Sequence, residues 1–192
     1  MSGILLETER LTIRRFTDAD VDELTQLDSD PDVTRFITGG IPEFDAAMLQ
    51  AWLSQYERWP AYGTFAAIEK ASAEFIGWFH LRPATDHGAD EPELGYRLRK
   101  DAWGKGYATE GSRALIDKAF RDLGASRVFA ETMTVNIGSR RVMEKAGLRF
   151  VRAFHADWPV RIPGDEHGDV EYALTREEWE QDRLPEAAPA GR

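Results

Sequence analysis

The sequence contains no cysteine and few histidines. Without a thiol, disulfide bonds, cysteine metal sites and a cysteine nucleophile are excluded. The four histidines, His80, His87, His155 and His167, show no HExxH pattern or other metal-ligand spacing. We therefore expect no metal in this protein.

A long apolar run is also absent. A membrane helix needs about 18–20 consecutive apolar residues, and no stretch approaches that length. The first residues, MSGILLETERLTIRRF, lack the basic segment followed by a long apolar one that marks a secretory signal. These features predict no membrane partner and a cytoplasmic location.

Positively charged residues are relatively few: the chain has 24 Lys and Arg against 34 Asp and Glu, which gives a net charge of −10. Nucleic-acid binding depends on a surplus of Lys and Arg, so we expect no nucleic-acid partner. The acidic balance does not exclude a locally basic site for an anionic ligand. An acidic surface would favour a cationic partner, and it would equally serve solubility alone.

The length and composition fit one domain. With 192 residues, of which 42% are hydrophobic, the chain can build a single core. We predict that residues 1–182 form this domain and that the Pro/Ala-rich tail 183–192 is disordered.

Hydrophobic periodicity predicts a mixed α/β chain. The predicted strands span 10–16, 64–69, 74–82, 93–98, 127–133, 148–154 and the first part of 169–180. The predicted helices span 18–28, 44–59, 107–123, 137–146 and the last part of 169–180. Polar or turn-rich loops are predicted at 31–44, 83–92 and 155–168. This order predicts an antiparallel meander followed by βαβ-type crossovers.

Residues 93–111, ELGYRLRKDAWGKGYATEG, are the most informative stretch. A predicted strand runs into Gly104-x-Gly106, and a predicted helix begins at once. Glycines let the backbone approach a ligand closely, and the N–H groups of a helix start favour an anion. The stretch therefore predicts a pyrophosphate cradle, with a plain strand-to-helix turn as the alternative. It is neither a P-loop nor the GxGxxG dinucleotide fingerprint, which fails at Thr109.

A second stretch, residues 127–148, adds a family resemblance. Its segment Asn136-Ile137-Gly138-Ser139-Arg140-Arg141 and the following EKAGL, taken with WGKGYATE, resemble the GNAT acetyltransferase superfamily, most of all its RimJ/RimL-type branch. The start LETERLTIRRFTDAD and the end YALTREEW are similar to that branch as well, so the resemblance covers about residues 5–180. Two positions depart from the usual pattern, Asp101 and Leu148.

The resemblance implies a fold and a co-substrate. The expected fold is a mixed, mostly antiparallel twisted sheet of about seven strands, splayed at its centre and flanked by about four helices. The expected acetyl donor is acetyl-CoA, which would rest on the glycine loop and on the strand before it. The implied coenzyme-binding residues are Leu98, Arg99, Trp103, Gly104, Lys105, Gly106, Tyr107, Ala108, Thr109, Asn136, Ser139 and Arg140.

The implied reaction is acetyl transfer to a primary amine, either the α-amine of a protein or peptide or the amine of a small molecule. Because the chain has no cysteine, we expect direct attack of the amine in a ternary complex rather than a cysteine acetyl-enzyme. The backbone N–H of Leu98 would stabilise the oxyanion. The acceptor would lie between loop 35–44 and segment 155–168, and relatives of this kind allow a homodimer.

The proton-transfer roles follow from the resemblance with alternatives left open. Ser139 is the candidate general acid, because the position where many relatives carry a Tyr is Met143; Ser139 would otherwise cap or orient. Glu93 is the first candidate for the general base, followed by Glu131 and His80. Glu93 would otherwise be a solvated carboxylate at a strand end, and Glu131 or His80 a structural residue on a strand. The rival functions are a non-catalytic acyl-CoA-binding module on the same fold, a nucleotide-binding enzyme and a plain interaction domain.

Overall fold

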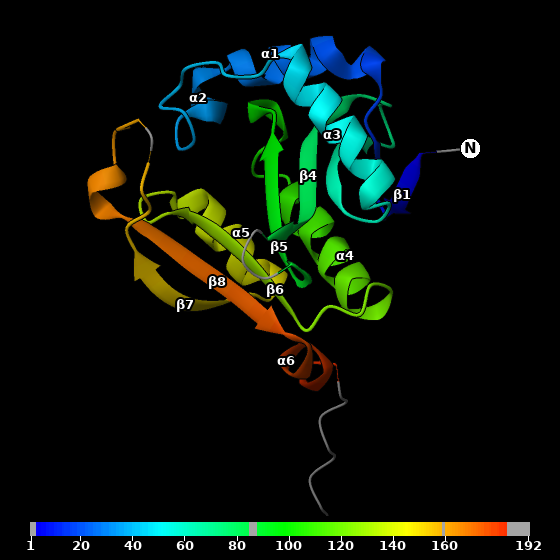
Figure 1. Cartoon of the computed structure of the whole chain (residues 1–192), viewed down its shortest axis with the longest axis vertical. Helices are drawn as coiled ribbons and strands as arrows, with labels where there is room; N and C mark the ends of the chain where they lie inside the picture. The colour runs from blue at the N-terminus through cyan, green and yellow to red at the C-terminus, as the bar shows by residue number, and fades with distance from the viewer. Residues whose placement is uncertain (1–2, 85–87, 159, 184–192) are drawn as a thin grey trace, which may run out of the picture.

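The computed structural model describes residues 3–84, 88–158 and 160–183. The expected tail lies outside these residues, except Arg183. One eight-stranded sheet forms the centre, in the spatial order β1-β2-β3-β4-β5-β6-β8-β7 (Figure 1). The strands are β1 (Ile4–Glu7), β2 (Leu11–Arg15), β3 (Gly63–Glu69), β4 (Phe75–Ala84), β5 (Gly88–Leu98), β6 (Arg127–Met133), β7 (Arg149–Phe154) and β8 (Asp169–Thr175). The α-helices are α1 (Val21–Ser29), α2 (Pro31–Thr34), α3 (Ala46–Arg58), α4 (Tyr107–Arg121), α5 (Ile137–Ala146) and α6 (Arg176–Gln181).

The predicted fold class is confirmed. Every neighbouring pair of strands is antiparallel except β5 and β6, which are parallel and meet at the single register pair Glu93↔Phe129. Beyond that pair β5 stays with β4 as far as Gly77↔Leu98, while β6 stays with β8 along its whole length. The two halves of the sheet therefore diverge at the centre, as the splayed ribbon in Figure 1 shows.

Some local expectations were wrong. The loop expected over 83–92 is wrong for its described residues, 83–84 and 88–92: β4 and β5 pair through Pro83↔Pro92 and Ala84↔Gly88, and this pairing outweighs the polar, turn-rich composition. The short strand β1 was not expected, and the pairing that makes it a strand is to β2 alone. Residues 31–34 form α2, because Asp30 accepts from Asp32 N at 2.9 Å and a proline at the first helical position suits a helix start. The expected irregular segment 155–168 holds one short 3₁₀ turn.

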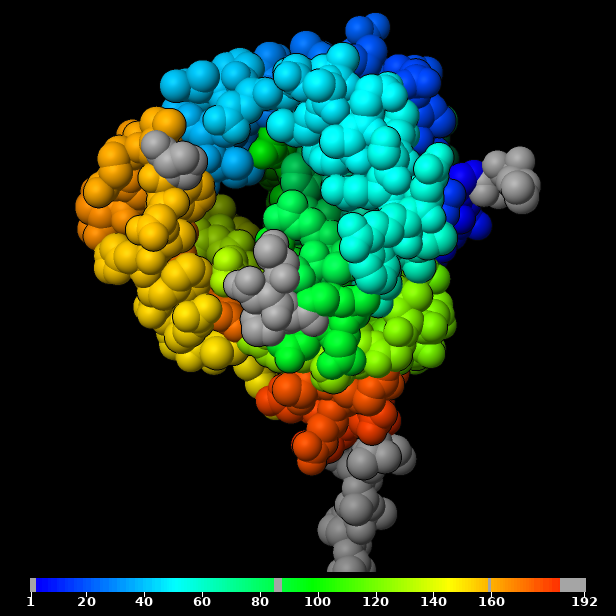
Figure 2. Space-filling model, viewed as in Figure 1, coloured from blue at the N-terminus to red at the C-terminus, as the bar shows by residue number. Residues whose placement is uncertain are grey.

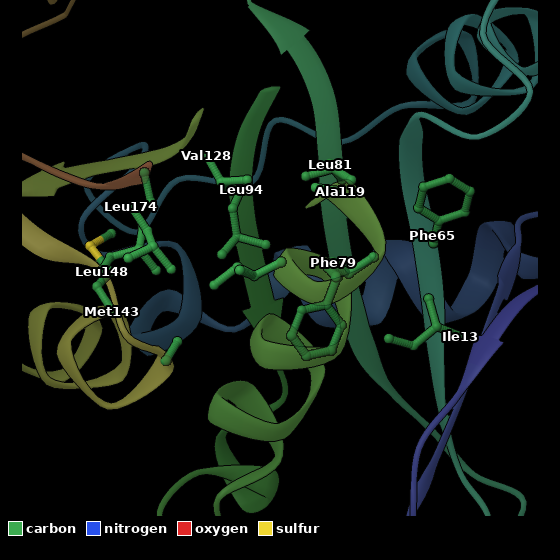
Figure 3. Close-up of a cluster of buried hydrophobic side chains, with 14 of the residues drawn as sticks. Ile13, Phe65, Phe79, Leu81, Leu94, Ala119, Val128, Met143, Leu148 and Leu174 are labelled. Atoms are coloured by element: carbon green, nitrogen blue, oxygen red, sulfur yellow. The ribbon is translucent and has the colours of Figure 1, made fainter. Parts of the chain in front are cut away.

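Helices cover both faces of the sheet. Helices α4 and α5 bury the larger core on one face, and Figure 3 shows side chains such as Phe79, Leu94 and Met143 converging there. Gly111 of α4 lies so close to β4 that an added Cβ would approach Phe79 Cζ to 2.3 Å. Helices α1 and α3 cover the other face with a smaller, aromatic-rich core. Within the described ranges, no helix is long and apolar enough to cross a membrane.

One buried ion pair joins three separate segments. Asp28 of α1 is 3% exposed, and its Oδ1 lies 2.5 Å from Arg97 Nη1 of β5. Its Oδ2 accepts from the backbone N–H groups of Glu43 and Phe44, at 2.6 and 2.8 Å. Arg97 in turn lies over the ring of Trp78. Asp28 therefore fixes the loop before α3 against the central strand.

We expect Asp28→Ala to destabilise the protein strongly, because it leaves the Arg97 charge and two backbone donors without their partner. Loss of one partner of a buried pair costs about 3–5 kcal/mol. Denaturant unfolding should show this as a fall in the free energy of unfolding. The control is Asp32→Ala, which removes an exposed pair with Lys100 and should lower the free energy of unfolding far less, because solvent screens that pair. Equal losses in the two variants would contradict the structural role of Asp28.

Candidate active site

A cavity of about 530 Å³ lies where the sheet splays. Its walls come from α2 and the residues after it, the C-terminal end of β5, most of residues 102–109, and Asn136 with one face of α5. These segments are distant in the sequence, and the divergence of β5 from β6 leaves room between them. A cavity of this size with a few convergent polar groups is typical of a small-molecule site.

The glycine loop forms one wall through its backbone conformation. Gly104 and Gly106 have φ of +73° and +86°, in the left-handed region that favours glycine. An added Cβ on Gly104 would meet nothing within 4 Å, so its conformation rather than crowding calls for glycine. Helix α4 begins directly after Gly106, and the first N–H groups of a helix have no partner within it. Tyr107, Ala108 and Thr109 all line the cavity at this helix start.

The cavity lining is positive although the protein is acidic. Four cationic residues line it against one acidic residue, Asp32; the cations are Arg35, Arg97, Arg141 and Lys145. Asp28 offsets the charge of Arg97, and Lys100 pairs with Asp32 at 2.5 Å. The remaining cations and the dipole of α4 favour a ligand with several negative charges. The phosphates of coenzyme A fit this donor set.

The end of β5 presents its backbone to the same gap. The backbone N–H of Arg99 donates to the carbonyl oxygen of Ile76 on β4 at 2.9 Å, and N–H directions alternate along a strand. The N–H of Leu98 therefore points away from β4, into the gap. The carbonyl of Leu98 accepts from the indole N–H of Trp103 at 2.8 Å, on that same side. The divergence of β6 leaves this strand edge to face the cavity.

Most of the residues predicted to bind the coenzyme line this cavity. They are Leu98, Trp103, Gly104, Gly106, Tyr107, Ala108, Thr109, Asn136 and Ser139. Three others do not line it. Arg99 pairs with Asp101, the carbonyl of Lys105 accepts from Arg10, and Arg140 contacts Tyr172 Oη and Thr134 O.

Sequence reasoning missed the cations on α5. Gly138, Arg141, Val142 and Lys145 all line the cavity, and their spacing of i, i+3, i+4 and i+7 places them on one helix face. That periodicity could have been read from the sequence. Arg35 carried no such signal, because it follows α2 in a segment expected to be a loop.

Asn136 and Ser139 lie at the N-terminus of α5. Asn136 Oδ1 accepts from Ser139 N at 3.2 Å, so Asn136 caps the helix, and its Nδ2 donates to Thr132 Oγ1 at 3.1 Å. Ser139 Oγ lies 3.0 Å from the hydroxyl of Tyr96 on β5, a residue that sequence reasoning did not select. Met143 is buried in the core.

Glu93 is held by basic neighbours. Its Oε2 lies 2.8 Å from Arg82 Nη2, and its Oε1 lies 3.7 Å from His80 Nε2. Burial opposes ionisation of Glu93, but the contact with His80 and the charge of Arg82 outweigh it and lower the pKa of Glu93 to about 2. Burial lowers the pKa of His80. Gly95 allows this packing, because an added Cβ would lie 2.3 Å from His80 Nε2.

Glu131 has the opposite electrostatic environment. It is exposed on β6, and partial loss of hydration together with the negative charges of Glu93 and Glu171 raises its pKa. Neither Glu93 nor Glu131 lines the cavity described above. On the face shown in Figure 2, the surface is hollowed between β5 and the residues that follow β7. In that segment the indole N–H of Trp158 donates to Asp169, and Asp165 pairs with Arg161.

Comparisons with known proteins give the family. A family model described as an acetyltransferase (GNAT) domain matches residues 10–149. The chain belongs to this family of acetyltransferases, and the prediction of an acyltransferase is confirmed.

Individual relatives agree with this assignment. The chain is 38% identical over 163 residues to the FsC-acetyl coenzyme A-N(2)-transacetylase of Aspergillus fumigatus, covering 80% of this chain and 68% of that protein. A GNAT-family acetyltransferase from Bacillus anthracis is 26% identical with a TM-score of 0.73, covering 90% of this chain and 99% of that one. The spermidine N-acetyltransferase of Vibrio cholerae, solved with CoA and spermine, has a TM-score of 0.72 at 14% identity, covering 90% of this chain and 99% of that one, and shares the fold.

The environments of the two glutamates predict opposite effects on stability. Because folding lowers the pKa of Glu93 from its ordinary 4.5 to about 2, its contribution is present above about pH 4.5 and is lost as the pH falls toward 2. Glu93→Gln should therefore destabilise the protein near neutral pH and flatten the dependence of stability on pH below 4.5. Folding raises the pKa of Glu131, so Glu131→Gln should leave stability unchanged or higher near neutral pH. Chemical unfolding across this pH range tests both, and equal losses at neutral pH would refute the assignment.

Proposed function

We propose that this protein is an acetyl-CoA-dependent N-acetyltransferase that transfers the acetyl group to a primary amine by direct attack in a ternary complex. The observation that carries the proposal is the positive cavity at the splay, lined by the glycine loop and by a strand edge. Family membership supports the chemistry. The absence of cysteine from the sequence supports direct attack over a cysteine acetyl-enzyme.

Different cavity residues would contact the diphosphate and the thioester of acetyl-CoA. The N–H groups between Trp103 and Thr109 would hold the diphosphate, with Arg141 and Lys145 adding charge from α5. These two cations replace Arg140 in the proposed site, because the guanidinium of Arg140 already contacts other groups. The N–H of Leu98 would donate to the thioester carbonyl as negative charge develops on its oxygen.

The acceptor must lose a proton before it attacks. A lysine-type amine has a pKa of about 10.4 and is mostly protonated near neutral pH. Glu93 is the first proposed base, acting directly or through water: it is ionised near neutral pH, although the contacts with His80 and Arg82 that lower its pKa also weaken it as a proton acceptor. Glu131 is the second, because a raised pKa makes a carboxylate a stronger base near neutral pH.

For the acceptor we propose a class, a primary amine, rather than a particular molecule. Glu131 on β6 is an exposed carboxylate that would favour a cationic amine, whereas its neighbours Glu93 and Glu171 are paired with Arg82 and with Arg127 and Arg152. The relative named as an N(2)-transacetylase supports a nitrogen acceptor. The motifs around Asn136 further lead us to infer the RimJ/RimL-type branch, for which a protein or peptide α-amine is the expected acceptor beside small amines. A homodimer and a cytoplasmic location stay predictions.

Calorimetry with acetyl-CoA tests the coenzyme site. We expect micromolar binding, about −8 kcal/mol, and its loss in Gly104→Val, whose side chain would enter the approach to the loop. Gly124→Val is the matched control: Gly124 has φ of +75°, an added Cβ there also meets nothing within 4 Å, and it lies beyond the other end of α4. Absence of binding by the wild type would refute the proposed function. Equal loss in both variants would point to strain rather than to the cradle.

Turnover separates the two proposed bases. With an amine identified by release of free CoA thiol, Glu93→Gln should lower kcat by about 100-fold, the size of a general-base contribution, with little change in acetyl-CoA affinity. Glu131→Gln is the comparison. Loss of kcat in Glu131→Gln alone would transfer the role of base to Glu131. Acetyl-CoA binding with no thiol release for any amine would favour the non-catalytic acyl-CoA-binding module.

A further inference from the structure

Two hydroxyl groups meet at the cavity from separate elements. Tyr96 comes from the C-terminal half of β5 and Ser139 from the first turn of α5, and both line the cavity. Tyr96 Oη lies 3.0 Å from Ser139 Oγ and 3.0 Å from the backbone carbonyl oxygen of Ser139. One phenol therefore contacts both the side chain and the main chain of the same serine.

The environment of Tyr96 keeps its phenol protonated, so that it can donate a hydrogen bond. Burial raises the pKa of the Tyr96 phenol well above its ordinary 10.0, and the hydrogen bond with Ser139 offsets this only in part. The ring packs against Phe79 with a centroid separation of 6.2 Å. Tyr96 thus stays neutral near neutral pH, with a single O–H to donate.

A single proton shared between two acceptors gives the pair two arrangements. In the first, Tyr96 donates to the Ser139 carbonyl, and the Ser139 hydroxyl donates to Tyr96 Oη. In the second, Tyr96 donates to Ser139 Oγ, and the Ser139 O–H is released toward the cavity. Both arrangements use the same heavy-atom positions, so rotation of two hydroxyl hydrogens interconverts them.

We propose that Tyr96 is a positioning residue for acetyl transfer: it donates to Ser139 Oγ and thereby directs the Ser139 hydroxyl to the sulfur that leaves the acetyl group. The inference rests on the proposed function. It assigns Ser139 the role of hydrogen-bond donor rather than of general acid, because an alcohol is a poor acid near neutral pH.

The step balances without proton transfer from either hydroxyl. The amine nitrogen forms a bond to the carbonyl carbon, the carbon–sulfur bond breaks, and its electron pair stays on sulfur. The proton lost by the amine goes to the base. The thiolate accepts a hydrogen bond from Ser139 until the product leaves and takes a proton from solvent. Hydrogen bonds to an ionised acceptor are stronger than neutral ones, so the donor pair favours the leaving group.

The test uses CoA itself and needs no acceptor amine. The ultraviolet absorbance of the thiolate gives the pKa of the CoA thiol when CoA is bound to the full-length protein. We expect Tyr96→Phe to raise this pKa by about one unit, a tenfold change in proton affinity, while CoA still binds. Cavity charges also act on the thiol, namely Arg35, Arg97, Arg141, Lys145 and Asp32, and they are the same in wild type and variant.

A double-mutant cycle identifies the route. Ser139→Ala should raise the thiol pKa as well, and Tyr96→Phe added to Ser139→Ala should change it no further, because Tyr96 acts through Ser139. Tyr62→Phe is the control: it removes a hydroxyl that donates to Ala89 O at 3.0 Å and does not line the cavity, so the thiol pKa should not change. In turnover, Tyr96→Phe should lower kcat about tenfold with KM for acetyl-CoA unchanged, as expected for one hydrogen bond to an ionised group.

The outcomes separate this inference from the proposed function. An unchanged thiol pKa in Tyr96→Phe overturns the positioning role while the acetyltransferase proposal stands. An equal rise in the wild-type and Ser139→Ala backgrounds also overturns it, since Tyr96 would then act independently of Ser139. Failure of the wild type to bind CoA overturns both.

Discussion

The parting of β5 from β6 is the constraint on which the site depends. β5 continues to pair with β4 as far as Leu98, and β6 is fully paired with β8, so two complete ladders draw the strands apart after the single pair Glu93↔Phe129. A sheet without this parting would turn the N–H of Leu98 toward another strand. Here that strand edge faces a cavity. The backbone groups available to a ligand therefore follow from the topology of the sheet.

The parting also separates two electrostatic environments. On the side of α5 and the glycine loop, cations such as Arg141 and Lys145 line a cavity in a protein with a net charge of −10. Near Glu93, carboxylates on β5, β6 and β8 lie close enough to shift the pKa of Glu131. There Glu93 is paired with Arg82 and Glu171 with Arg127 and Arg152, so Glu131 carries the raised pKa beside two ion-paired carboxylates.

Arg97 connects the cavity with the aromatic residues beside His80 and with the loop before α3. It lines the cavity, pairs with the buried Asp28 and lies over Trp78, which stacks on His80 at a ring separation of 5.6 Å. Asp28 also holds the backbone before α3. The position of that loop relative to the central strand is therefore fixed by a hydrogen-bonded network rather than by apolar packing alone.

Features that depend on neighbouring residues were readable from the sequence. The glycines of WGKGYATE adopt left-handed backbone and precede a helix start, and Gly147 ends α5 with φ of +103°. Each of these is set by local hydrogen bonds and backbone sterics, so the sequence determined the glycine loop, the main helices and, with the family pattern, the fold. The tertiary structure decided the rest: the extension of the β4–β5 pairing through Pro83↔Pro92, the ion pair that fixes Glu93, and the contact between Tyr96 and Ser139, 43 residues apart. These depend on which distant segments the packed sheet brings together, and no short-range pattern encodes that.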